Sequence, residues 1–139
     1  MKISAYCEQV LKSYESLELA AYVCPAGKLT IGWGHTGKVD GVKIHKGLRI
    51  TQDKAQELFE KDIETVEDPL SKEPYADNLS DDRWDALVSL IFNIGWGQFT
   101  KSTLRRKLLA NINDKTIPNE FRKWVYSKGE KLPGLVKRR

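Results

Sequence analysis

The sequence has few cysteines and lacks a long apolar run. Two cysteines among 139 residues, Cys7 and Cys24, cannot form a disulfide framework, and their spacing matches no metal motif. We therefore expect two free thiols, no metal and no other cofactor. The most apolar stretch, residues 87–94, is too short to span a membrane. Glu8 interrupts the N-terminal region before an apolar run of signal-peptide length, which predicts synthesis in the cytoplasm.

A large excess of charge is also absent. The formal net charge is +4, with 30% charged and 40% hydrophobic residues, which is typical of one globular domain over residues 1–139. A mildly basic chain favours an anionic partner, and nucleic acid, acidic lipid and the carboxylate-bearing bacterial cell wall all fit. Basic and aromatic residues are not interleaved and no nucleic-acid-binding motif is visible, so we expect no nucleic-acid partner.

The hydrophobic pattern in the first third of the chain predicts one helix and a small sheet. Apolar residues recur at helical spacing over residues 3–15, and the sheet is expected within residues 18–48. Residues 29–33 alternate between large apolar residues and smaller ones, as in a strand. Residues 25–28 predict a turn between two short strands, and residues 37–47 predict a third strand or a long hairpin.

From residue 51 onward the pattern is helical. Thr51 and Ser80 are expected N-cap residues, and the glycines of Gly95-Trp96-Gly97 end a helix. The expected helices cover residues 51–69, 81–94, 100–110 and 118–126. The predicted fold class is α+β, with a small sheet lobe of about residues 15–50 and a mainly helical lobe of about residues 51–139 that includes the N-terminal helix.

Three polar residues stand at fixed intervals in an apolar, glycine-rich stretch. Glu15 is followed by eight residues and Cys24, then by five residues and Thr30. A carboxylic acid at the edge of a cleft can protonate the oxygen of a leaving group, which glycoside cleavage requires. The Thr30 hydroxyl both donates and accepts hydrogen bonds, so it can orient a water molecule.

This stretch resembles the signature of the phage T4-type lysozymes, the endolysins of glycoside hydrolase family 24. The resemblance rests on AYVCPAGKLTIGWGHT and continues in order through ITQDKAQELFEKDI, LSDDRWDALVSLIFNIGWGQFTKSTLRRKL and EFRKWVYSKGEKLPGLVKRR. It implies a lysozyme-like fold with a cleft between the two lobes. It also implies cleavage of the β-1,4 bond between N-acetylmuramic acid and N-acetylglucosamine in peptidoglycan.

The resemblance assigns roles to several residues. Glu15 would be the general acid, and Thr30 would position the attacking water. Cys24 stands where the family has Asp or, in some members, Cys. Asn93 would line the far wall of the cleft, and Trp33 flanks the strand that carries Thr30, so both are expected to bind substrate.

The role of Cys24 stays open among three readings. It is a thiolate nucleophile or base, a neutral group that shapes the water site, or a bystander. An ordinary thiol has a pKa of ~8.5, and a nearby Glu15 carboxylate is expected to raise it, which favours the neutral group.

The remaining residues of note are expected to be structural. His35 has no second ligand at metal spacing, and the resemblance puts Asp62 where it pairs with this histidine, so we expect an ion pair between them. Trp84, Trp96 and Trp124 are expected in the core because they lie on helical stripes.

The resemblance also implies partners and location. We expect the partner to be peptidoglycan, the protein to be a monomer without stable membrane association, and the chain to accumulate in the host cytoplasm until a separate holin opens the membrane. Two alternatives remain. A lytic transglycosylase needs one acidic Glu and no second carboxylate, and a non-catalytic wall-binding module or nucleic-acid binder would use the positive charge.

Overall fold

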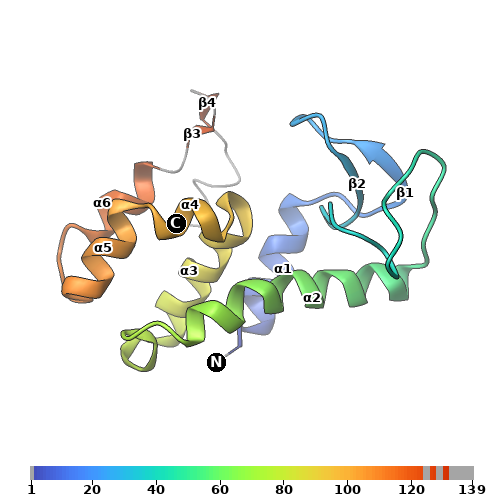
Figure 1. Cartoon of the computed structure of the whole chain (residues 1–139). Helices are drawn as coiled ribbons and strands as arrows, with labels where there is room; N and C mark the ends of the chain where they lie inside the picture. Colours follow the sequence, from blue (N-terminus) through green and yellow to red (C-terminus); the bar gives the residue numbers. More distant parts are fainter. Residues whose placement is uncertain (1, 124–125, 128–129, 132–139) are drawn as a thin grey trace. The chain divides into compact units, whose positions relative to one another are not determined.

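The computed structural model describes residues 2–123, 126–127 and 130–131. It has the predicted α+β architecture, with a small two-stranded sheet near the N-terminus and a mostly helical body (Figure 1). The elements are, in order, α1 (Ala5–Tyr14), β1 (Glu18–Val23), β2 (Leu29–Gly32), α2 (Gln52–Ser71), the 3-10 helix η1 (Ala76–Asn78), α3 (Asp81–Ile94), α4 (Trp96–Thr100), α5 (Thr103–Ala110), α6 (Ile117–Arg122), β3 (Tyr126–Ser127) and β4 (Glu130–Lys131).

The chain divides into two compact units. One is Gln9–Glu64, which contains the β1–β2 sheet, and the other combines Met1–Glu8 with Thr65–Arg139. The single-domain organisation and the cleft expected from the sequence stay predictions. None of the helices in the described part of the chain is long and apolar enough to cross a membrane.

β1 and β2 form an antiparallel hairpin closed by the predicted turn. Tyr22 pairs with Thr30 and Val23 with Leu29. The Cys24 N–H donates to the Lys28 carbonyl at 2.9 Å, and the Gly27 N–H donates to the Cys24 carbonyl at 2.8 Å. These bonds place Cys24 at the start of a tight turn, directly beside the strand that carries Thr30.

Residues 37–47 do not form the predicted strand or long hairpin. Val39 and Val42 exchange two backbone hydrogen bonds of 2.8 and 2.9 Å around Asp40 and Gly41, both at positive φ, and the rest is loop. The β-forming residues here act as anchors instead, because Val39 and Ile44 are buried in a core with Ile31 and Leu58.

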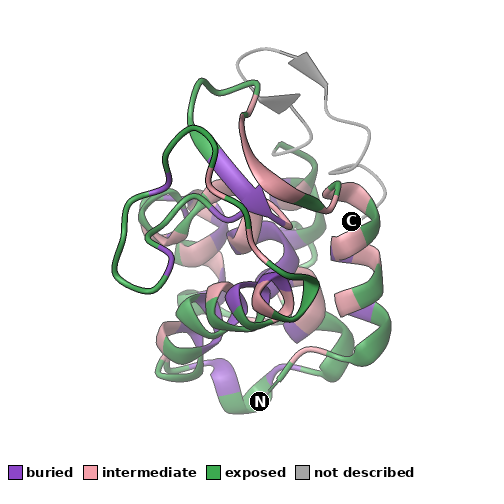
Figure 2. Cartoon of the chain, turned by 90° about the vertical axis from the view of Figure 1, so that its right-hand side faces the viewer, coloured by how far each residue is buried: buried purple, intermediate pink, exposed green. Residues whose placement is uncertain are grey.

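α2 begins as predicted and ends slightly later. The Thr51 hydroxyl accepts from the Lys54 N–H at 3.1 Å, as an N-cap does. The expected apolar stripe is buried: Ala55, Leu58, Phe59, Ile63 and Val66. The helix continues through Pro69 to Ser71, so the proline does not end it. Figure 2 shows the buried residues of the chain in purple.

α3 carries the apolar stripe predicted for it. Ser80 accepts from the Arg83 N–H at 3.2 Å and caps the helix, and Gly95 at φ 89° ends it. Trp84 is 1% exposed, which confirms its place in the core.

The elements after α3 are shorter than predicted. Trp96 begins the separate helix α4 and is half-buried, with its ring 5.3 Å from that of Phe99. α5 begins after Ser102 and not at Thr100 as predicted. Ser102 is its N-cap, since the Ser102 hydroxyl accepts from the Arg105 N–H at 3.1 Å. The helix expected over 118–126 ends at Arg122, and Trp124 lies outside the described residues.

Candidate functional site

Glu15 stands directly after α1, where the helix gives way to β1. Its N–H donates to the Lys12 carbonyl at 3.3 Å, and its side chain is half-buried. The carboxylate lies against the backbone of Gly34, two residues past β2, since a Cβ built on Gly34 would be 2.9 Å from Oε2 of Glu15. The fold therefore brings Glu15 to the same segment that carries Thr30.

Cys24 has polar neighbours that shift the pKa of its thiol. The Thr30 hydroxyl, followed by the backbone N–H groups of Lys28 and Ala26, lowers the pKa of the Cys24 thiol below its ordinary value. The expectation that a nearby Glu15 would raise this pKa is therefore wrong in direction. These polar neighbours outweigh the opposing effect of partial burial on the pKa of the thiol.

Thr30 is deeply buried, since the residue is only 2% exposed. Its Oγ1–H donates to the Lys28 carbonyl at 3.0 Å, across the turn that follows Cys24. A hydroxyl has one proton, so it points either to this carbonyl or to the Cys24 sulfur. Thr30 and Cys24 therefore form a coupled pair.

Tyr22 belongs to this group, and sequence reasoning missed it. It pairs with Thr30 across the hairpin and precedes Cys24 by two residues, which places the three on one face of the strands. Partial burial, followed by the charge of Glu15, raises the pKa of the Tyr22 phenol, so it stays protonated. The signal that could have identified Tyr22 is the two-residue period of a strand, which puts Tyr22 and Cys24 of AYVC on the same face.

His35 and Asp62 form the contact expected of them. Nδ1 of His35 lies 2.9 Å from Oδ2 of Asp62, and Nε2 lies 3.0 Å from the Lys38 carbonyl. Both ring nitrogens face acceptors, so the doubly protonated imidazolium fits best. Hydrogen bonding to Asp62 accordingly raises the pKa of His35. The pair ties the segment after β2 to α2.

We expect this pair to make stability depend on pH. A raised pKa in the folded state gives stability that is fully present below the unfolded value of ~6.5 and is lost as pH rises through the folded value. His35→Asn should lower the free energy of unfolding by about 1–3 kcal/mol at pH 6 and flatten its dependence on pH. Urea unfolding between pH 5 and 9 measures this.

His45 provides the matched control. It is exposed, so His45→Asn should change stability by less than about 0.5 kcal/mol. An NMR titration of the wild type should place the His35 midpoint above the ordinary value. An unshifted midpoint would contradict the ion pair.

Trp33 has one ring face covered by a cation. Nζ of Lys12 lies 4.3 Å from the ring centroid and also donates to Oε1 of Gln56. The ring meets Phe59 edge-on at 6.0 Å. These contacts pack the segment after β2 onto α1 and α2, and the expected role of Trp33 in binding substrate stays a prediction.

Asn93 lies in the last turn of α3 and is half-buried. Its Nδ2 donates to the Ser89 carbonyl one turn earlier, at 2.8 Å. This bond fixes the orientation of the amide. Asn93 belongs to the unit that does not contain Glu15, and its role as a substrate contact stays a prediction.

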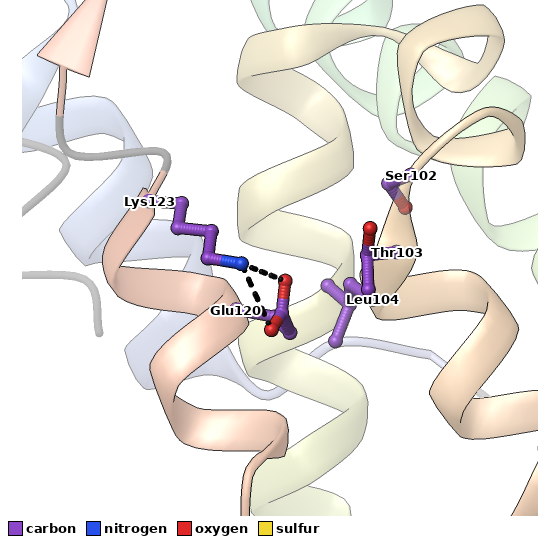
Figure 3. A pocket seen from close by; sticks show the side chains of 5 residues that line it. All are labelled: Ser102, Thr103, Leu104, Glu120 and Lys123. Carbon is purple, nitrogen blue, oxygen red and sulfur yellow. Dashed lines mark hydrogen bonds and ion pairs between the residues drawn. The ribbon is translucent and has the colours of Figure 1, made fainter.

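A hollow of about 170 Å³ has none of the proposed site residues in its lining. Figure 3 shows its lining, with Glu120 and Lys123 near Ser102, Thr103 and Leu104. Lys107 and Lys123 both donate to Glu120, at 2.7 and 2.9 Å, so its carboxylate is already neutralised. Among the described residues, no three His, Cys, Asp or Glu side chains lie closely enough together to hold a metal ion.

Comparison with known proteins gives similarity over the whole chain. A family model described as phage lysozyme matches residues 12–139. The endolysin of Acyrthosiphon pisum secondary endosymbiont phage 1 is 40% identical over 144 residues, which cover 100% of this chain and 93% of that protein. The endolysin of Salmonella phage P22 is 44% identical over 136 residues, with 98% and 90% covered.

Solved structures agree with this similarity. A crystal structure of a P22 lysozyme mutant matches with a TM-score of 0.75 at 38% identity and covers 100% of this chain and 94% of that chain. The match confirms the lysozyme-like fold that the sequence predicted.

Proposed function

Because the chain belongs to the phage lysozyme family, we propose that it cleaves the β-1,4 bond between N-acetylmuramic acid and N-acetylglucosamine and so lyses bacterial cells. As a member of this family it is a lysozyme-type glycosidase that acts on peptidoglycan. The observation that supports the finer proposal is the position of Glu15, whose carboxylate lies against Gly34, beside the strand that carries Thr30.

Glu15 serves as the general acid. The leaving group in glycoside cleavage is a sugar hydroxyl, which departs poorly as an alkoxide, so a positioned acid must protonate its oxygen. A half-buried carboxyl at the end of a helix suits this role because its position is set by the backbone around it. The proton passes from the Glu15 carboxyl to the glycosidic oxygen as the bond to the anomeric carbon breaks.

Cys24 and Thr30 act on the anomeric carbon and the attacking water, and not on the leaving group. The developing oxocarbenium carbon needs a negative group or a held water molecule. The Thr30 hydroxyl orients the water, and Cys24 either removes its proton as a thiolate or shapes the water site as a thiol. The polar neighbours of Cys24, which lower its pKa, support the thiolate more than the sequence alone did.

Substrate contacts and cellular context complete the proposal. The family resemblance assigns a place in the cleft wall to Asn93, Trp33 is proposed to bind sugar because it flanks the strand that carries Thr30, and a net charge of +4 suits the anionic wall. The enzyme works as a monomer on peptidoglycan, without nucleic acid or stable membrane association. It accumulates in the host cytoplasm and reaches the wall after a separate holin opens the membrane.

A lytic transglycosylase is the second candidate. The observation that favours it is Cys24 itself, because a transglycosylase needs one acidic Glu and no second carboxylate. In that reaction a hydroxyl of the muramic acid residue, and not water, attacks the anomeric carbon. Thr30 and Cys24 would then have no water to hold.

We expect digestion of purified peptidoglycan to release fragments that end in a reducing N-acetylmuramic acid. Mass spectrometry of borohydride-reduced products measures this, because hydrolysis gives a reducible end and transglycosylation gives a 1,6-anhydro sugar. Anhydro products would identify the transglycosylase. Binding to the wall without any released fragment would identify a non-catalytic module.

A further inference from the structure

Gly34 approaches the Glu15 carboxylate more closely than a side chain would allow. A Cβ added to Gly34 would lie 2.9 Å from Oε2, 3.2 Å from Cδ and 3.7 Å from Oε1 of Glu15. Ordinary contacts of a real Cβ begin at 3.4 Å. An alanine here would therefore require Oε2 to retreat by at least about 0.5 Å.

The backbone conformation alone does not account for this glycine. Gly34 has φ +77°, which favours glycine, but Gly41 has φ +79° and no atom within 4 Å of an added Cβ. Gly32, at φ +68°, would meet Ala55 and Ile50 at ordinary contact distances. Among the described glycines, the short contact with Glu15 thus distinguishes Gly34 from positions with the same backbone strain.

We propose that Gly34 is a positioning residue for the reaction, which sets where the Glu15 carboxylate lies. The proposal rests on the proposed function in one respect, that Glu15 is the general acid. The bare Cα of Gly34 lets the carboxylate rest against the backbone, and this backbone closes one side of the space around it. A side chain at residue 34 would displace the Glu15 carboxylate from this position.

An alanine at position 34 should move the carboxylate and leave the fold in place. The colliding atoms are the far end of a flexible side chain, which turns aside more easily than backbone moves. Proton transfer needs heavy atoms about 2.6–3.2 Å apart, and a misplacement of about 1 Å lowers a rate on the order of 100-fold. The loss is in turnover, because the sugar-binding residues are unchanged.

The test compares Gly34→Ala with Gly41→Ala. Both substitutions place alanine at nearly the same φ, so we expect similar decreases in melting temperature. Gly41→Ala should keep wild-type wall lysis, whereas Gly34→Ala should lose about 10- to 100-fold in turnover. Sedimentation with insoluble peptidoglycan should show equal binding by both variants. Glu15→Gln, measured in the same assay, gives the wall lysis that remains without the general acid.

Equal lysis by Gly34→Ala and Gly41→Ala would overturn the positioning role, as would a loss of Gly34→Ala activity that follows only from weaker binding. If Gly34→Ala is less stable than Gly41→Ala or does not fold, the substitution is repeated in a Glu15→Ala background. The extra loss of stability relative to Gly41→Ala should vanish in that background, because the colliding carboxylate is gone. If the extra loss of stability persists, the proposal is contradicted. Retained lysis by Glu15→Gln would instead reject the proposed function.

Discussion

Glu15→Gln is expected to abolish lysis of bacterial cell walls while the protein stays folded. Glutamine keeps the shape of the side chain but has no acidic proton to give to the glycosidic oxygen. A positioned general acid contributes about 10²- to 10⁴-fold to a rate, and we expect a loss at the upper end. Because Glu15 is only half-buried, the free energy of unfolding should change by less than about 1 kcal/mol. Clearing of a cell-wall suspension measures the first effect and thermal unfolding the second.

Glu18→Gln is the matched control for this experiment. Glu18 is the exposed first residue of β1, three positions along the chain, and the chemical change is identical. It should retain lysis close to that of the wild type. Lysis by Glu15→Gln at a similar level would falsify the assignment of Glu15.

Cys24→Ala is expected to lose about 10- to 100-fold in turnover, whereas Cys24→Asp should keep most of it. Alanine removes the group proposed to face the water, while Asp supplies the carboxylate that the family resemblance implies for this position. The two variants measured together separate the chemistry of the group from its volume. Equal activity of Cys24→Ala and the wild type would make the thiol a bystander.

The pH dependence of the same variants separates the thiolate from the thiol. The pKa of Cys24 lies below its ordinary value, so a thiolate mechanism makes wild-type activity rise with pH through that lowered pKa. An Asp is ionised above pH ~4, so Cys24→Asp lacks this rise. Dividing wild-type activity by Cys24→Asp activity cancels the titrations that the two proteins share. This ratio increases with pH if the thiolate is the active form and decreases with pH if the thiol is.

Thr30 and Cys7 supply the controls for this titration. Thr30→Val removes the hydroxyl that contributes most to lowering the thiol pKa, so reaction of Cys24 with iodoacetamide should require a higher pH. Cys7 is 7% exposed, and Cys7→Ser removes its background reaction. An unchanged reaction profile in Thr30→Val would show that the backbone amides alone set the pKa.

Local signals were enough to predict α2 and α3, whereas the shorter helices after α3 were predicted less well. Thr51 and Ser80 were identified as caps because a cap bond spans only three residues, and the stripe on α2 is a property of its own period. Residues 37–47 were predicted less well. Their β-forming residues gave the same signal as a strand, but their side chains are used to fill the core beside Ile31.

The site was harder to predict than the fold because its chemistry depends on directions in space. The spacing of Glu15, Cys24 and Thr30 marks the residues, but not the neighbouring hydroxyl and backbone groups that lower the pKa of the Cys24 thiol. Their effect on its pKa is opposite to what a neighbouring carboxylate suggests. The covering of Trp33 by Lys12 is likewise invisible in the sequence, because the two residues meet only after the chain has folded.

The proposed catalytic groups are all carried by one short stretch of a single compact unit. Glu15, Cys24 and Thr30 lie within residues 15–30, and their supports Gly34 and His35 follow at once. A crossover between two related phage genes on either side of this stretch would transmit the whole set together. The rest of the chain could then diverge, or be exchanged for that of a relative, without separating the acid from the groups that work with it.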